Sequence, residues 1–200
     1  LISGLRLQTV GRVPILGVED LAINRLFSRI AKRLLDVIGA TVGLILSAPV
    51  VIVLALLIKG ESPGGPVFFR QRRVGARHRP FTLIKLRSMH PEAAAEDDAR
   101  QSTARNDPRL LRIGGLLRRW NLDELPQFWN VLRGEMSLVG PRPLTPQDVD
   151  RLVAQHPPLA ARFAVAPGIT GLSQIYQAQG AQRTAELDAR YVHERSLRLD

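Results

Sequence analysis

The longest apolar run in the chain extends from Val37 to Ile58, 22 residues without a charge in which only Thr41, Ser47 and glycines interrupt the large apolar side chains. As a helix, this run would be about 33 Å long at about 1.5 Å per residue, close to the bilayer core of about 30 Å. It lies too far along the chain to be a signal peptide. A buried core helix is the alternative, although small soluble domains rarely bury so long an uncharged run. The pattern therefore favours a membrane helix.

Pro49 lies inside this run and predicts a bend. Proline has no N–H to donate to the carbonyl of Ile45, and its ring pushes that carbonyl away, so a helix kinks at this point. Ser47, two residues earlier, can help to satisfy the backbone groups that the kink frees. We therefore expect a break in the helix between Ser47 and Pro49.

Basic residues flank the apolar run on both sides. They are Arg25, Arg29, Lys32 and Arg33 before it, and Arg70, Arg72, Arg73, Arg77 and Arg79 after it. Because positive charge stays on the cytoplasmic side of a membrane, both flanks favour the same side. We therefore predict that residues 29–60 form a re-entrant anchor helix that enters and leaves one leaflet. The alternative is a plain membrane span whose orientation is set by another domain.

The remaining pattern predicts an α/β domain over residues 61–200 that is mostly helical with short strands. We expect this to be the catalytic domain. Apolar and β-branched residues predict strands at 67–70 and 81–86, joined by a polar turn at 75–80. Further expected elements are an exposed helix or loop at 91–106, helices at about 122–133, 146–163 and 182–197, a Gly/Pro-rich loop at 140–146 and a turn at 167–171. Residues 1–28 show no clear period and the chain begins with Leu1, so we expect a linker from an upstream domain.

Residues 110–120 have leucines and arginines interleaved at helical spacing. The apolar members are Leu110, Leu111, Ile113, Leu116, Leu117 and Trp120. Such a basic amphipathic stretch is suited to an anionic membrane surface. A core-facing helix with solvated arginines fits the same pattern, and the sequence leaves both interpretations open.

Composition narrows the function classes. The chain carries 28 Lys and Arg against 18 Asp and Glu, a net charge of +10, which indicates an anionic partner such as a phosphorylated substrate, an anionic lipid or a nucleic acid. It has no cysteine, which excludes disulfides, thiolate metal sites and cysteine nucleophiles. Aromatic residues make up only 5%, which argues against a stacking platform for single-stranded nucleic acid.

The block from Asn121 to Gln127 (NLDELPQ) is the part of the sequence most indicative of chemistry. Asn121 with Glu124 three residues later resembles a capping box, and Pro126 fits only the first turn of a helix. Asp123 and Glu124 would then lie at a helix N-terminus, where the helix dipole favours negative charge. They could be no more than good first-turn acids, because adjacent Asp and Glu are common.

Several basic residues are candidates for binding phosphate close to these two acids. They are Lys85, Arg87, Arg118, Arg119 and Arg142. A carboxylate pair among cations could hold a divalent metal together with a diphosphate, one carboxylate attacking phosphorus and the other binding the metal. The sequence has neither a P-loop nor a dinucleotide-binding Gly-x-Gly-x-x-Gly motif after a strand, and its four histidines lack metal-ligand spacing.

From about residue 31 to residue 200, the sequence resembles the bacterial sugar transferases, the monotopic phosphoglycosyl transferases that begin surface-glycan assembly. The resemblance rests on the ordered blocks KRLLD (32–36), the Ser47–Pro49 break, GPVFF (65–69), QRRVG (71–75), KLRSM (85–89), LDELPQ (122–127), NVLRGEMS (130–137), GPRP (140–143), PGITG (167–171) and ELD (186–188). The probability that so many blocks match in the same order by chance is very small.

The resemblance implies a reaction. A UDP-sugar gives its phosphosugar to a polyprenol (undecaprenyl) phosphate and UMP is released, with Mg2+ as cofactor and an aspartyl-phosphosugar intermediate. By matching position, Asp123 is the nucleophile and Glu124 its metal-binding partner, with Asp123 also near the metal. The resemblance also implies a helix that re-enters the bacterial inner membrane at a Ser-Pro break, with the catalytic domain at the cytoplasmic face. Here one residue, Ala48, separates Ser47 from Pro49.

One departure from the family pattern concerns the loop after Gly171. Many relatives carry a Gly-Arg pair there, whereas this chain has no Arg before Arg183 and the loop is shorter. Two rival functions also stay open: a non-catalytic membrane module that docks a partner, and a nucleic-acid-binding protein. The second leaves the apolar run and the acidic pair unexplained, so we expect no nucleic acid partner. The sequence leaves a homo-oligomer open.

Overall fold

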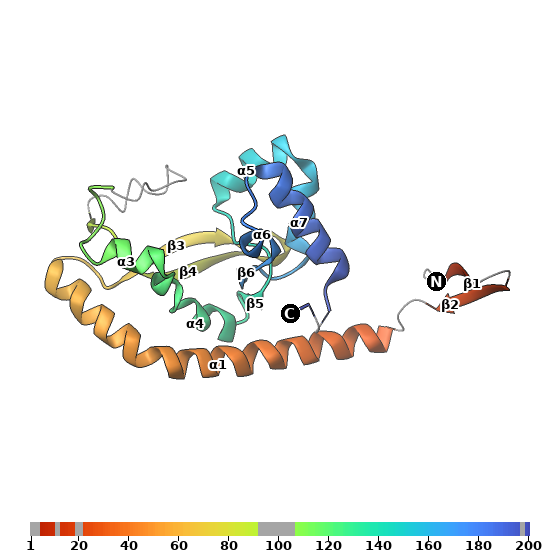
Figure 1. Ribbon diagram of the computed structural model, residues 1–200, viewed down its shortest axis with the longest axis horizontal. Coiled ribbons are helices and arrows are strands. Elements are labelled where there is room, and N and C mark those ends of the chain that lie inside the picture. Colours follow the sequence, from red (N-terminus) through yellow and green to blue (C-terminus); the bar gives the residue numbers. More distant parts are fainter. Residues whose placement is uncertain (1–4, 11–12, 19–21, 92–106, 197–198) are drawn as a thin grey trace.

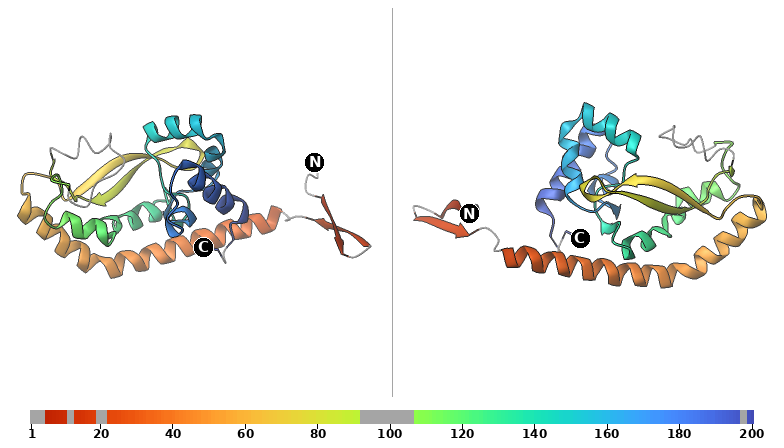
Figure 2. Two further views of the ribbon diagram at one scale, coloured as in Figure 1. Left: turned by 45° about the horizontal axis from the view of Figure 1, so that its top comes forward. Right: turned by 180° about the vertical axis from the view of Figure 1, so that it is seen from behind.

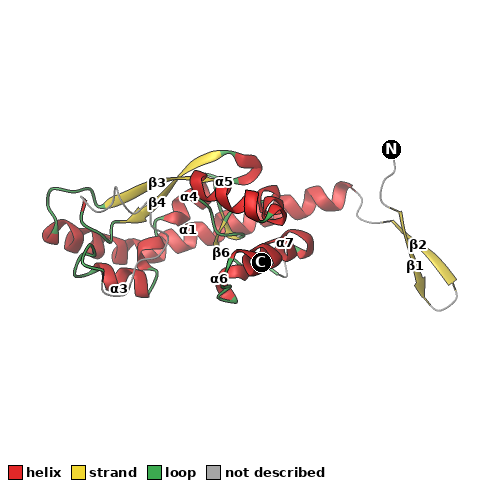
Figure 3. Ribbon diagram, turned by 90° about the horizontal axis from the view of Figure 1, so that it is seen from above, coloured by secondary structure: helices red, strands yellow, loops and turns green. Residues whose placement is uncertain are grey.

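A computed structural model of the 200-residue chain describes residues 5–10, 13–18, 22–91, 107–196 and 199–200. A single long helix, α1 (Ala22–Glu61), runs along the base of a small mixed body of short helices and strands (Figure 1). The predicted class, α/β and mostly helical with short strands, is confirmed. Seen from above, β3 and β4 lie on one side of α1, while α3, α6 and α7 lie on the other (Figure 3).

The strands form two-stranded sheets. In the body, β3 (Phe68–Val74) pairs antiparallel with β4 (Pro80–Leu86), which confirms the two predicted strands and the turn between them. A second sheet pairs β5 (Ser137–Val139) with β6 (Gly168–Thr170) in parallel. The turn expected at 167–171 is therefore wrong. Strands of three residues show no readable alternation, which is why the sequence pattern did not indicate them.

The helices of the body are shorter than the sequence pattern indicated. They are α3 (Gly114–Arg119), α4 (Gln127–Leu132), α5 (Pro146–Gln155), α6 (Leu172–Ile175) and α7 (Ala181–Glu194), with 3-10 segments at Leu122–Glu124 and Pro157–Ala164. The helix expected at 146–163 is divided at His156, which has φ −137° and ψ 80°. The cause is Pro157, because a residue before proline avoids the helical region.

Residues 1–28, which we expected to be a linker from an upstream domain, include regular secondary structure. β1 (Leu5–Val10) and β2 (Val13–Val18) form an antiparallel hairpin, which lies apart from the body in both views of Figure 2. Helix α1 already begins at Ala22. Of the expected segment 91–106, residues 92–106 lie outside the described residues.

Helix α1 continues through Pro49 without interruption and curves in its C-terminal part around the body (Figures 1 and 2). Ser47 does hydrogen-bond a backbone carbonyl, but that of Leu44, at 3.4 Å, rather than that of Ile45. By length and composition, Phe27–Glu61 is apolar enough to cross a membrane. Its outward face exposes large apolar side chains such as Ile38, Ile45, Leu46, Ile52 and Leu56.

The opposite face of α1 is part of the core of the body. Ala40 packs in one cluster with Phe81, Leu83, Val131 and Met136. Leu54 and Ile58 pack in a second cluster, with Leu86, Leu111 and Leu117. Both halves of the predicted anchor, residues 29–60, therefore supply buried residues to the same body.

Gly43 allows α1 to approach α4 closely. A Cβ atom added at Gly43 would lie 2.8 Å from Cε1 and Cζ of the Phe128 ring, closer than packed carbon atoms approach. We predict that Gly43→Val lowers the free energy of unfolding by about 1–3 kcal/mol through overpacking, measured by thermal unfolding in detergent.

Gly60→Ala is the matched control, since no heavy atom lies within 4 Å of a Cβ added at Gly60 in the same helix. Alanine should leave stability unchanged or raise it by up to about 1 kcal/mol through its helix propensity. Equal stability of Gly43→Val and wild type would mean that α1 and α4 do not pack as described.

Candidate functional site

Asp123 and Glu124 lie in a single 3-10 turn, Leu122–Glu124, between α3 and α4. Asn121 precedes this turn with φ 53°, a left-handed conformation that Asn tolerates better than most residues. The predicted capping box is wrong, because Asn121 makes no side-chain cap hydrogen bond and the helix expected from residue 122 begins only at Gln127. Three residues of 3-10 helix supply little dipole, so the charges of the acids depend on neighbouring side chains.

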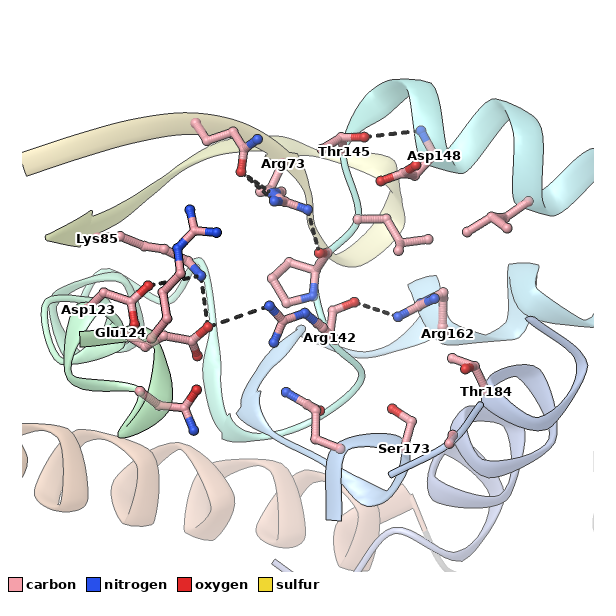
Figure 4. Close-up of a pocket in the computed structure, with 18 of the residues that line it drawn as sticks. Arg73, Lys85, Asp123, Glu124, Arg142, Thr145, Asp148, Arg162, Ser173 and Thr184 are labelled. Atoms are coloured by element: carbon pink, nitrogen blue, oxygen red, sulfur yellow. Dashed lines mark hydrogen bonds and ion pairs between the residues drawn. The ribbon is translucent and has the colours of Figure 1, made fainter. Parts of the chain in front are cut away.

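Lys85, in β4, supplies the nearest of those charges. Its Nζ atom lies 2.8 Å from Oε1 of Glu124 and 3.9 Å from Oδ2 of Asp123. Arg142, from the loop after β5, places Nη2 3.5 Å from the same Glu124 oxygen. Figure 4 shows the three elements meeting at the two carboxylates. Lys85 and Arg142, two of the residues predicted to bind phosphate, therefore lie beside the acidic pair.

The two carboxylates have different environments. Asp123 is buried, and this burial raises the pKa of its carboxyl despite the opposing charge of Lys85. Burial acts in the same direction on Glu124, but Lys85 and Arg142 together outweigh it and hold the pKa of Glu124 below its usual range. Glu124 is thus the more firmly ionised of the pair.

Asn130 fixes the distance between the strand that carries Lys85 and the helix that follows the acids. Its side chain is fully buried, accepts a hydrogen bond from the Ile84 amide at 3.2 Å and donates to the Thr82 carbonyl at 2.7 Å. It also donates to Glu135 at 2.6 Å. We did not identify Asn130 as a site residue from the sequence, because nothing local indicates which strand it contacts.

The acids and cations open on a pocket of about 1070 Å³. Its lining extends from Lys85, Asp123 and Glu124 past Arg142 to α7, where Thr184 lies (Figure 4). Basic side chains outnumber acidic ones along this lining. The basic ones are Arg73, Lys85, Arg87, Arg118, Arg142 and Arg162, and the acidic ones are Asp123, Glu124 and Asp148. The pocket is suited to an anionic ligand.

Two of the predicted phosphate-binding arginines have other contacts. Arg118 lines the pocket, stays close enough to Asp123 to oppose the rise of its pKa, and donates from Nε to Ser88 at 2.9 Å. Arg87 is 2% exposed and both of its Nη atoms donate to Ser62, at 3.1 Å and 2.9 Å. Arg87 therefore joins β4 to the end of α1, and its guanidinium is not brought to the carboxylates.

The acidic pair could contribute to a Mg2+ site. Mg2+ in proteins is commonly bound by one or two carboxylates together with phosphate oxygens and water. Asp123 and Glu124 offer that number of carboxylates beside a pocket with room for a diphosphate. Among the described residues, no group of three or more His, Asp or Glu could hold a metal without a ligand. The two carboxylates fit the protein's share of such a Mg2+ site.

Comparisons with known proteins agree on one family. A family sequence profile described as bacterial sugar transferase matches residues 27–200. The UDP-glucose:undecaprenyl-phosphate glucose-1-phosphate transferase of Caulobacter vibrioides is 47% identical over 156 residues, which cover 78% of this chain and 57% of that protein. The protein of the same name from Escherichia coli K12 is 38% identical over 202 residues, covering 98% of this chain and 43% of that protein.

A shorter relative is similar over most of its own length. The uncharacterised sugar transferase EpsL of Bacillus subtilis is 40% identical over 173 residues, covering 86% of this chain and 82% of that protein. By contrast, the chain spans only about half the length of the two glucose-1-phosphate transferases.

The contacts of Asn130 generate a stability prediction. Asn130→Leu should remove its hydrogen bonds and leave the Ile84 amide and the Thr82 carbonyl without this partner, at about 1–3 kcal/mol for each buried group left unpaired. The measurement is thermal unfolding of the full chain. Thr82→Val is the control, because Thr82 is exposed and contributes to this contact only through its backbone. An unfolding temperature of Asn130→Leu equal to that of Thr82→Val would contradict the role given to Asn130.

Proposed function

The chain belongs to the bacterial sugar transferase family, and from this membership we propose that it transfers a phosphosugar from a UDP-sugar to polyprenol (undecaprenyl) phosphate, releasing UMP. The observation that carries the proposal is the carboxylate pair held by Lys85 and Arg142 at one end of a basic pocket. The names of the relatives support a sugar phosphate as the group transferred and undecaprenyl phosphate as its acceptor.

In the proposed first step, a carboxylate oxygen of Asp123 attacks the phosphorus atom that carries the sugar. The bond from that phosphorus to the bridging oxygen breaks, and its electron pair leaves with UMP. In the second step, a phosphate oxygen of the polyprenol phosphate attacks the aspartyl phosphosugar. The Asp123 carboxylate is released, and the product is a polyprenol diphosphosugar. Splitting the transfer in this way lets a soluble donor and a lipid acceptor use one site in turn.

The surrounding charges support this assignment of roles. A diphosphate beside two carboxylates needs cations to offset the repulsion, and Lys85, Arg118 and Arg142 are the nearest candidates. Glu124, whose pKa is held low, would bind Mg2+ together with Asp123 and the substrate phosphates. When bound, Mg2+ would neutralise the diphosphate and stabilise UMP as the leaving group.

For the membrane, we propose that α1 is re-entrant and that the body lies at the cytoplasmic face of the bacterial inner membrane. Residues from both halves of α1, Ala40 and then Leu54 and Ile58, are buried against the same body. A straight crossing would carry one half of α1 away from that body. The exposed apolar side chains of α1 would instead enter one leaflet while both of its ends stay on one side.

The nucleophile is tested by intact-protein mass spectrometry. The full chain mixed with UDP-sugar and Mg2+, without acceptor, should gain the mass of one phosphosugar, and Asp123→Asn should abolish both this adduct and UMP release. Glu124→Gln should lower the rate of adduct formation by about 100-fold or more, because a neutral amide is a poorer ligand for Mg2+ than the carboxylate that it replaces. Chelation of Mg2+ by EDTA should also stop adduct formation.

Asp150→Asn is the control for this experiment, because Asp150 is an exposed carboxylate of α5 outside the pocket lining. Its adduct should form as in the wild type. An adduct that persists in Asp123→Asn would place the nucleophile elsewhere. Turnover that requires both substrates, with no adduct ever trapped, would indicate direct transfer.

The topology of α1 is tested with single cysteines, since the chain has none of its own. Ser28→Cys and Gly64→Cys place exposed thiols at the two ends of the helix. An impermeant maleimide should label neither thiol from the periplasmic side of spheroplasts and both in inverted membrane vesicles. Leu46→Cys, on the outward apolar face, should react only after detergent is added. Labelling of the two ends from opposite sides would show a membrane span instead.

A further inference from the structure

The segment Pro141–Arg142–Pro143 is held through its backbone from three directions. The carbonyl of Pro141 accepts a hydrogen bond from the Gly168 amide at 2.9 Å, and that of Pro143 accepts one from Arg73 at 3.1 Å. The carbonyl between them, that of Arg142, accepts one from Nη2 of Arg162. Both prolines are buried, while 52% of the Arg142 side chain is exposed toward the pocket. The backbone of Arg142 is therefore fixed while its guanidinium stays available to a ligand.

Arg162 belongs to a buried ion pair behind this segment. Its Nη2 atom lies 3.3 Å from Oδ2 of Asp188 in α7, and the two residues are 4% and 2% exposed. The Ser173 side chain, from the pocket wall in α6, also hydrogen-bonds to Asp188. A chain of contacts thus runs from Glu124 through Arg142 and Arg162 to Asp188 and Ser173, and Figure 4 shows its first two links.

Stability alone does not account for a buried pair of this kind. Removing two charges from water carries a large desolvation cost, and apolar residues of similar volume commonly give equal or greater stability. Burial indeed lowers the pKa of Arg162 and raises that of Asp188, each partly offset by the partner's charge. What an apolar pair could not do is donate a hydrogen bond to the carbonyl of Arg142.

We propose that Arg162, held in place by Asp188, is a positioning residue that sets the backbone of Arg142 so that its guanidinium faces Glu124 and the diphosphate of the substrate. The inference rests on the proposed function, in which Arg142 binds that diphosphate. Arg162 also lines the pocket, but its side chain is only 3% exposed. Its Nη2 atom donates to the Arg142 carbonyl and pairs with Asp188, so Arg162 acts through Arg142 and not on the substrate. Because Asp188 belongs to α7 and also hydrogen-bonds to Ser173 of α6, it joins both helices to Arg162.

The test replaces both charges at once, so that no unpaired charge is left in the core. Arg162→Met/Asp188→Leu is compared with Arg142→Ala and with the triple variant, by calorimetric binding of UDP to the full chain and by thermal unfolding. The control Arg190→Met/Glu194→Leu makes the same replacement in an exposed pair on α7. We expect the Arg162/Asp188 variant to unfold within a few degrees of the wild type but to bind UDP about tenfold more weakly, as Arg142→Ala does.

The triple variant decides between positioning and direct contact. If Arg162 acts through Arg142, the triple variant should bind UDP no more weakly than Arg142→Ala alone. Multiplied losses would mean that Arg162 contacts the ligand itself, and wild-type affinity in the Arg162/Asp188 variant would mean that the pair has no part in binding; either result overturns the inference. Failure of the proposed function has a different signature, in which the wild type does not bind UDP or Arg142→Ala binds it unchanged.

Discussion

Two adjacent carboxylates in a mostly buried turn are the constraint on which the rest of the structure depends. Asp123 and Glu124 repel each other and lose hydration together, so burial without cations would protonate one of them. The fold supplies two such cations, Lys85 from a strand and Arg142 from a loop, and both form ion pairs with Glu124. Neither cation is adjacent in sequence to the acids, so a tertiary scaffold must hold three separate segments in register. Asn130, which joins β4 to α4, and Arg162, which fixes the backbone of Arg142, belong to that scaffold.

Helix α1 sets the positions of the segments on both sides of the acids. Near its C-terminal end, Glu61 accepts a hydrogen bond from the Ile113 amide at the start of α3. In its N-terminal half, Arg33 donates from both Nη atoms to the carbonyls of Val131 and Leu132, at 2.6 Å and 2.7 Å, at the end of α4. The turn that carries the acids lies between α3 and α4. The apolar helix is therefore a template for the site, and a change in its curvature would alter the distance between the two helices that flank the acids.

Features encoded locally were predictable from the sequence, and features that depend on distant partners were not. A short stretch of sequence is enough to predict each of three features: the long apolar helix, the strand pair β3–β4 and the acidic pair. The division of helices at Pro126 and Pro157 follows from proline but is obscured by the helical spacing on either side. The parallel pairing of β5 with β6 and the ion pair of Arg162 with Asp188 join residues about 30 positions apart, and no local period marks them. For the same reason Arg87, placed among the phosphate-binding residues by its position beside Lys85, instead contacts Ser62.

The use of arginine in this chain changes what its net charge of +10 means. Several arginines in the described part of the chain donate to backbone carbonyls inside the body, among them Arg33, Arg73, Arg87 and Arg162. A guanidinium presents five N–H groups in a planar fork, so one side chain can donate to two acceptors at once, as Arg33 does to the carbonyls of Val131 and Leu132. A lysine in these positions would offer a more strongly hydrated point charge that is costlier to bury. Part of the positive charge therefore stabilises the fold, and a count of basic residues overstates the charge that is free to bind anions. The inference of an anionic ligand depends instead on the few cations that face the acids, Lys85, Arg118 and Arg142.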